Sequence, residues 1–147
     1  MTGLHPGGSA FSELLVEVFR VNGLLLAAGD ELARPAGLTS ARWQVLGVVD
    51  HGPATVAQVA RIMGLTRQSV QQTADALVRD KLIELVENPA HQRARLMTLT
   101  STGREALRYV EVQQSGWANA IAERLPPAEL RACLAVLRDL GDLLDDQ

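Results

Sequence analysis

The chain has 147 residues, of which 47% are hydrophobic, and this is enough to form one domain with a real core. Its single cysteine excludes an intramolecular disulfide bond. No secretory signal is visible, and the apolar run at residues 24–28 is too short to cross a bilayer. We therefore expect a cytoplasmic protein that does not enter a membrane.

The net charge of −3 argues against nucleic acid at first, but the charge is unevenly distributed along the chain. Residues 61–95 contain six Arg or Lys and four Asp or Glu, and the rest of the chain contains eight and thirteen. Exposed charges more than about 10 Å apart are largely screened by salt, so a locally basic face can still bind phosphates. The modest local charge predicts weak nonspecific binding and reliance on a dimer.

The chain begins with a Gly-, Pro- and His-containing stretch, residues 1–9, that is predicted to be disordered. A helix is predicted over residues 11–32, because apolar residues recur on one of its faces. This face consists of Phe11, Leu14, Leu15, Val18 and Phe19.

Residues 55–79 have the pattern of two short helices joined by a tight turn. Thr55 and Gln58 have the spacing of a capping box at the start of the first helix. Gly64 suits the turn, because glycine adopts a positive φ readily, and Thr66 is a good N-cap for the second helix. A helix-turn-helix places its second helix in the major groove of DNA.

The second helix of this pair has one apolar and one polar face. Val70, Ala74, Leu77 and Val78 recur at helical spacing and are predicted to be buried. Glutamine can pair bidentately with adenine and arginine with guanine, so the polar face can read bases. An ordinary solvated helix face is the alternative. The predicted DNA contacts of this segment are Thr55, Thr66, Arg67, Gln68, Ser69, Gln71 and Gln72.

A hairpin is predicted over residues 82–100, where Ile83 and Leu85 alternate with other residues as in a half-buried strand, and an Asn-Pro pair signals a turn. Arg93 and Arg95 lie between the strands. An arginine on a projecting loop can enter a narrow minor groove, whose potential is strongly negative, and we predict this role for both residues. The alternative is that they only make the loop soluble.

Two more helices are predicted in the C-terminal third, at residues 102–124 and after the Pro-Pro break at residues 126–127. Leucines of the last helix recur at near-heptad spacing. A terminal helix this apolar needs a partner surface, either in a second copy or, alternatively, in the same chain. The candidate interface residues of both ends of the chain are Phe11, Leu14, Leu15, Val18, Trp117, Leu130, Leu134 and Leu137.

Enzyme chemistry finds little support in the sequence. His5, His51 and His91 are far apart and show no metal-ligand spacing with Cys133. No Gly-rich phosphate loop follows a predicted strand. Cys133 lies in the leucine-rich last helix, where we expect a buried structural thiol rather than a redox-active one. We expect no metal, no cofactor and no catalytic site.

Taken together, these segments resemble the MarR family of bacterial transcription regulators. The resemblance rests on residues 38–46, on the helix-turn-helix at 55–79, on residues 88–94 of the hairpin and on residues 99–103. It covers nearly the whole chain. It implies a mainly helical (α+β) single domain over residues 1–147, a winged helix-turn-helix with about six helices and a small antiparallel wing.

The resemblance also implies how the chain is organised. Residues 11–34 and 102–146 would be dimerisation helices that interlock across a two-fold axis, and residues 38–100 would be the DNA-binding lobe. Two departures from the family pattern are visible. His91 stands where the family usually has an aspartate that orients basic side chains, and Arg42 stands where glutamine is common.

Effectors of the resembled family bind near the second helix, where Arg42 and Trp43 are neighbours in this chain. We expect Trp43 to pack in the core. Alternatively, Trp43 floors a pocket for a small flat aromatic ligand, with Arg42 at the rim to meet a carboxylate.

We therefore predict a sequence-specific, ligand-responsive transcriptional regulator that binds double-stranded DNA as a homodimer, a repressor or alternatively an activator. Two-fold symmetry predicts a palindromic operator with half-sites about 10 bp apart. The alternative is a winged-helix protein-interaction module without DNA binding, which His91 and the acidic net charge would favour.

Overall fold

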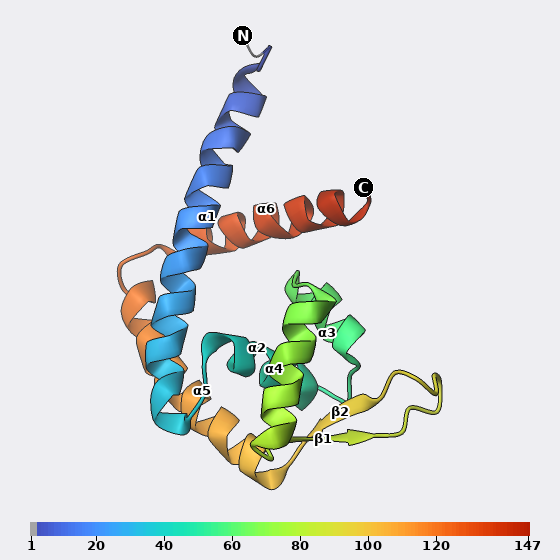
Figure 1. Cartoon of the computed structure of the whole chain (residues 1–147). Helices are drawn as coiled ribbons and strands as arrows, with labels where there is room; N and C mark the ends of the chain where they lie inside the picture. Colours follow the sequence, from blue (N-terminus) through green and yellow to red (C-terminus); the bar gives the residue numbers. More distant parts are fainter. Residues whose placement is uncertain (1–2) are drawn as a thin grey trace. The chain divides into compact units, whose positions relative to one another are not determined.

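The structure, a computed structural model, describes residues 3–147, which form six α-helices, one 3₁₀ turn and a two-stranded sheet (Figure 1). The elements are α1 (Pro6–Ala33), η1 (Arg34–Ala36), α2 (Ser40–Asp50), α3 (Val56–Met63), α4 (Arg67–Arg79), β1 (Ile83–Val86), β2 (Leu96–Leu99), α5 (Ser101–Ala122) and α6 (Pro127–Asp145). The predicted fold class is confirmed. The chain divides into two compact units, one ending at Val110 and one comprising Glu111–Gln147.

Helix α1 begins at Pro6, so the prediction of disorder is wrong for residues 6–9. Proline fits the first turn because the N–H that it lacks would have no helical partner there. In addition, Nδ1 of His5 accepts a 3.2 Å hydrogen bond from the backbone N–H of Gly8 and caps the helix. Residues 1 and 2, which the same prediction covered, lie outside the described residues.

Ser40 fastens α1 to α2. Its Oγ donates a 2.7 Å hydrogen bond to the carbonyl oxygen of Leu26, and its N–H donates a 2.7 Å bond to Oδ1 of Asp30. The two helices approach closely because Gly29 has no side chain: a Cβ there would lie 2.2 Å from Ser40 Oγ. This joint therefore requires glycine on one helix and a small hydroxyl residue on the other.

The predicted helix-turn-helix is confirmed, and short-range capping explains its boundaries. Thr55 and Gln58 form both hydrogen bonds of a capping box at the start of α3. Gly64 ends α3 with φ +66°, in the left-handed region that glycine adopts without strain. Thr66 Oγ1 accepts a 3.1 Å hydrogen bond from Ser69 N–H and starts α4.

The core of the first unit lies between α2, α3, α4, the base of the hairpin and the first turns of α5. Val78 of α4 is an exception to the predicted buried face, because 37% of it is exposed. It lies eight residues after Val70, and eight steps of 100° place it about 80° around the helix from Val70, at the edge of the buried stripe. The fully buried large side chains are Leu46, Leu77, Ile83, Met97, Leu107, Val45, Val59, Val70 and Val110.

Strands β1 and β2 form the predicted antiparallel wing, which projects from the first unit (Figure 1). Ile83 is buried, whereas Leu85 is 37% exposed, so the predicted burial of both residues is wrong for Leu85. The core covers only the base of the hairpin. There, Met97 also exchanges two backbone hydrogen bonds with Ala54, which precedes α3.

Helix α5 starts against the turn between α4 and β1. Thr100 Oγ1 accepts a 3.0 Å hydrogen bond from Gly103 N–H and donates a 2.8 Å bond to the carbonyl oxygen of Lys81. A Cβ on Gly103 would lie 2.0 Å from the carbonyl oxygen of Leu82. Glycine is therefore required at this contact.

Helix α6 has no buried residue. Cys133 is exposed, so the prediction of a buried thiol is wrong for the single chain. The leucines of its apolar stripe are also exposed, at 41% for Leu130, 45% for Leu134 and 40% for Leu137. Packing within the unit Glu111–Gln147 therefore does not cover the stripe, whereas Trp117 of α5 is half-buried.

Candidate nucleic-acid interface

The solvent-facing side of α4 carries most of the side chains that were predicted to read DNA. Burial of Val70, Ala74 and Leu77 fixes the rotation of this helix about its axis, so the other face points to solvent. The predicted residues that are exposed there are Thr66, Arg67, Gln68, Ser69, Gln71 and Gln72.

Some of these exposed side chains already make hydrogen bonds within the chain, and others do not. Ser69 Oγ donates a 3.0 Å hydrogen bond to the carbonyl oxygen of Thr66, and Gln71 Nε2 donates a 2.8 Å bond to Oδ1 of Asp75. Within residues 3–147, no hydrogen bond occupies the side-chain amides of Gln68 and Gln72. These two amides are therefore the groups most ready to pair with base edges.

A groove of about 420 Å³ lies between α4 and the wing. It brings Arg67 of α4 together with Arg93 and Arg95 of the wing, which lie about thirty positions later in the chain. Gln68 and Gln71 line the same groove. Three guanidinium groups and two amides on one concave surface suit an anionic, hydrogen-bonding partner such as a DNA backbone.

Thr55 also lines this groove but is only 7% exposed. Its Oγ1 accepts a 3.1 Å hydrogen bond from Gln58 N–H, so the hydroxyl already serves as the cap of α3. The structure thus places this predicted DNA contact at the groove wall in a structural role.

Side-chain acceptors close the tip of the wing. Oδ1 of Asn88 accepts a 3.0 Å hydrogen bond from Ala90 N–H. Nδ1 of His91 accepts two, at 3.3 Å from Arg93 N–H and at 3.2 Å from Ala94 N–H. His91 therefore holds the backbone of the arginine that the sequence predicted to contact DNA.

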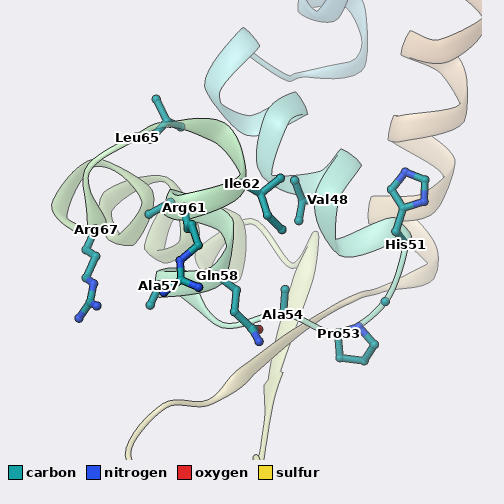
Figure 2. Close-up of a pocket in the computed structure, with 12 residues that line it drawn as sticks. Val48, His51, Pro53, Ala54, Ala57, Gln58, Arg61, Ile62, Leu65 and Arg67 are labelled. Carbon is teal, nitrogen blue, oxygen red and sulfur yellow. The ribbon is translucent and has the colours of Figure 1, made fainter. Parts of the chain in front are cut away.

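Arg61 is a candidate DNA-binding residue that the sequence analysis missed. It lies in the last turn of α3 and lines, with Arg67, a second groove of about 700 Å³. Figure 2 shows Arg61, Arg67 and Gln58 extending to the same side of α3 and α4. The helical pattern of the sequence shows that Arg61 lies opposite the buried Val59 and Ala60. That Arg61 lies near Arg67 depends on the turn between the two helices, which the pattern does not predict.

Arg42 is engaged away from the cavity at which it was expected. Its Nη1 donates a 2.9 Å hydrogen bond to Oδ2 of Asp80, and only 22% of the Arg42 side chain is exposed. Asp80 is the C-cap of α4, so this ion pair ties the C-terminal end of α4 to α2. The structure therefore does not bring Arg42 to the rim of a pocket beside Trp43.

Trp43 is half-buried and lines a mainly apolar cavity of about 560 Å³ between α1, α2 and α3. It also packs against the core cluster, as expected from the sequence. Leu25 and Leu26 of α1 form another wall, and Gln44 and His51 supply polar groups. The cavity can hold a small apolar or aromatic molecule.

Within residues 3–147, no cluster of three His, Cys, Asp or Glu side chains could hold a metal ion. None of the described helices combines the length and the apolarity needed to cross a membrane.

Comparison with known proteins agrees with this geometry. The model of the MarR family matches residues 36–94, which contain α2, the helix-turn-helix, β1 and the wing tip. The uncharacterized protein Rv2011c of Mycobacterium tuberculosis is 40% identical over 127 residues, which are 86% of this chain and 89% of the relative.

Two solved structures have the same fold. The M. tuberculosis transcriptional regulator MosR in complex with DNA has a TM-score of 0.74 at 23% identity, covering 90% of this chain and 96% of that one. Staphylococcus aureus MarR in complex with salicylate and kanamycin has a TM-score of 0.78 at 15% identity, covering 95% of each chain. With its helix-turn-helix, wing and matched family model, the chain belongs to the MarR family of DNA-binding transcriptional regulators, which are not enzymes.

Proposed function

We propose that this chain is a homodimeric, ligand-responsive repressor that binds a palindromic operator. In each protomer α4 enters the major groove, and the wing follows the adjacent minor groove. The observation that carries the proposal is the groove in which Arg67, Arg93 and Arg95 converge beside the amides of α4. We assign repression because occupancy of promoter DNA is sufficient for it.

Base reading in this proposal falls to Gln68 and Gln72, and Arg67 and Gln71 contact bases or phosphates. Ser69 and Thr66 lie at the positive N-terminal end of α4, which favours a phosphate. Arg61 adds a backbone contact from α3. Arg93 and Arg95 supply charge for the narrow groove, whose negative potential attracts guanidinium groups.

Exposed apolar side chains at both ends of the chain support a homodimer. Phe11 and Leu15 of α1 are 41% and 37% exposed, although Leu14 and Val18 beside them are half-buried. Helix α6 has no buried residue at all. Leaving such stripes in water is unfavourable by about 25 cal/mol per Å², so a second copy that covers them would stabilise both chains.

The cavity beside Trp43 is the proposed effector site, and its chemistry suits a flat aromatic acid. The indole and leucine walls offer apolar contact, and Gln44 and His51 offer polar contact at the edge. S. aureus MarR, a structural neighbour of this chain, was solved with salicylate, which is such an acid. A ligand releases DNA only if it binds the DNA-free arrangement more tightly than the bound one.

Operator selection from random duplex DNA, followed by a salt-controlled binding titration, tests the proposal. We expect a palindromic consensus with half-sites about 10 bp apart and one dimer bound to each site. Sequence-independent binding of the same strength would overturn operator recognition, and no binding at all would leave a protein-interaction module as the function. An aromatic acid added to the complex should then raise the operator Kd.

A further inference from the structure

The tip of the wing depends on one imidazole. Residues 87–95 lie beyond the last paired residues of β1 and β2, so no strand pairing holds them. Two backbone N–H groups there, those of Arg93 and Ala94, instead donate to the same Nδ1 atom of His91. His91 N–H in turn donates a 3.1 Å hydrogen bond to the carbonyl oxygen of Asn88.

The chemistry of this acceptor differs from that of a carboxylate or an amide. Nδ1 accepts hydrogen bonds only in the neutral tautomer that carries its proton on Nε2, and the imidazolium form has two donors and no acceptor. Imidazoles change charge between about pH 5 and 8, whereas carboxylates remain acceptors over this whole range. A proton on His91 would therefore remove both hydrogen bonds at once.

We propose that His91 is a positioning residue that holds Arg93 in its DNA-binding place only while its imidazole is neutral, so that acidification weakens operator binding. The proposal rests on the proposed function in one respect, namely that the wing contacts DNA. The effect acts through a change of shape, because Nδ1 is the atom that accepts both hydrogen bonds that close the turn.

The charged groups near His91 do not include a partner for its imidazolium form. Glu87, Arg93 and Arg95 share the wing segment with it, and Arg67 of α4 lines the groove with both arginines. Among the described residues, no ion pair joins His91 to a carboxylate. The imidazolium thus has no partner that would hold it where the neutral ring lies.

An imidazolium near DNA also attracts phosphates, which opposes the loss of shape. This attraction is screened within about 8 Å at 0.15 M salt, whereas the lost hydrogen bonds do not depend on salt. Two net hydrogen bonds correspond to about a five- to 150-fold loss of affinity for each protomer. At this ionic strength we therefore expect weaker binding at about pH 5.5 than at about pH 8.

The test compares the wild type with His91→Asp, because an aspartate can accept the same backbone N–H bonds without titrating in this range. Amide exchange and chemical shifts of Arg93 and Ala94 are followed by NMR in the DNA-free protein between about pH 8 and 5.5. Operator Kd is measured over the same range. His5→Asn is the matched control, because Nδ1 of His5 also accepts a backbone N–H, at the start of α1.

On acidification of the wild type and of His5→Asn, the amides of Arg93 and Ala94 should lose protection from exchange and the operator Kd should rise. In His91→Asp, neither the protection nor the Kd should change. Amides that keep their protection in the wild type, or a Kd that rises equally in His91→Asp, would overturn the proposal. If the amides respond but Kd does not, and Arg93→Ala also binds normally, the failure lies in the DNA contact of the wing and not in the hydrogen bonds of His91.

Discussion

Gln72 has a side-chain amide that no described hydrogen bond occupies, and it lies on the face of α4 that points away from the core. Replacing Gln72 with alanine should change which base is preferred at one operator position by about 1–3 kcal/mol. Arg61→Ala is the control, since losing a phosphate contact should weaken all sequences alike. Repeated operator selection with each variant measures the difference, and an unchanged preference for Gln72→Ala would contradict base reading.

Arg93 lies where its charge can reach a minor groove without any role in the core. Arg93→Ala should weaken operator binding by about 1–3 kcal/mol for each protomer while the thermal unfolding midpoint stays the same. Binding must be compared at fixed salt, because phosphate contacts depend on it. Wild-type affinity in such a titration would remove the wing from the mechanism.

The sequence predicted which side chains of the candidate site are exposed, but it did not predict their hydrogen-bond partners or their neighbours. The glutamines and arginines were found because helical periodicity and a turn signal predict which side chains are exposed. The hydrogen bond that His91 Nδ1 accepts from Arg93 N–H and the closeness of Arg61 to Arg67 depend on turn conformation. The ion pair of Arg42 and Asp80 joins residues 38 positions apart, and no local sequence pattern predicts such a contact.

At the scale of secondary structure, the best-predicted elements are those with local capping signals. Thr55, Gly64 and Thr66 act within a few residues of their own positions, and all three caps are present. Errors occurred where burial depends on distant parts of the chain. Leu85 lies beyond the base of the hairpin that the core covers and Val78 lies at the edge of the buried stripe of α4, so each is only partly covered.

The junction of α4, β1 and α5 depends on Gly103. Gly103→Ala should destabilise the fold by about 1–3 kcal/mol, because the new Cβ meets a backbone oxygen that can yield only by moving the chain. Urea unfolding monitored by circular dichroism measures this loss. Gly116→Ala on the same helix is the control: no atom lies within 4 Å of a Cβ there, so it should be neutral or stabilising.

At the scale of the whole molecule, the exposed stripe of α6 predicts the oligomeric state. Glutamate at both Leu134 and Leu137 should produce monomers or unfolded chains, because each change places a charge in an apolar interface. Sedimentation velocity gives the mass of the assembly. Ala132→Glu, on the opposite side of α6, should remain dimeric, and a folded dimer of the double variant would show that the interface lies elsewhere.

The cavity beside Trp43 predicts a coupled optical and functional response. In a Trp117→Phe background only Trp43 emits, and millimolar salicylate should quench it while raising the operator Kd. Val48→Phe, which narrows the same cavity without adding a second tryptophan, should weaken both effects together. Quenching without release of DNA would mean that the cavity binds the acid but does not regulate.

The contact at Ser40 gives the first unit the properties of a lever. Ser40 makes two hydrogen bonds to α1, and Gly29 leaves no space for even a Cβ between the helices. Close packing of this kind resists sliding of α1 along α2. Arg42 then links α2 to the C-terminal end of α4. We therefore expect a change in the angle of α1 to shift α4, the helix proposed to read DNA, and Gly29→Ala to disturb regulation more than DNA binding itself.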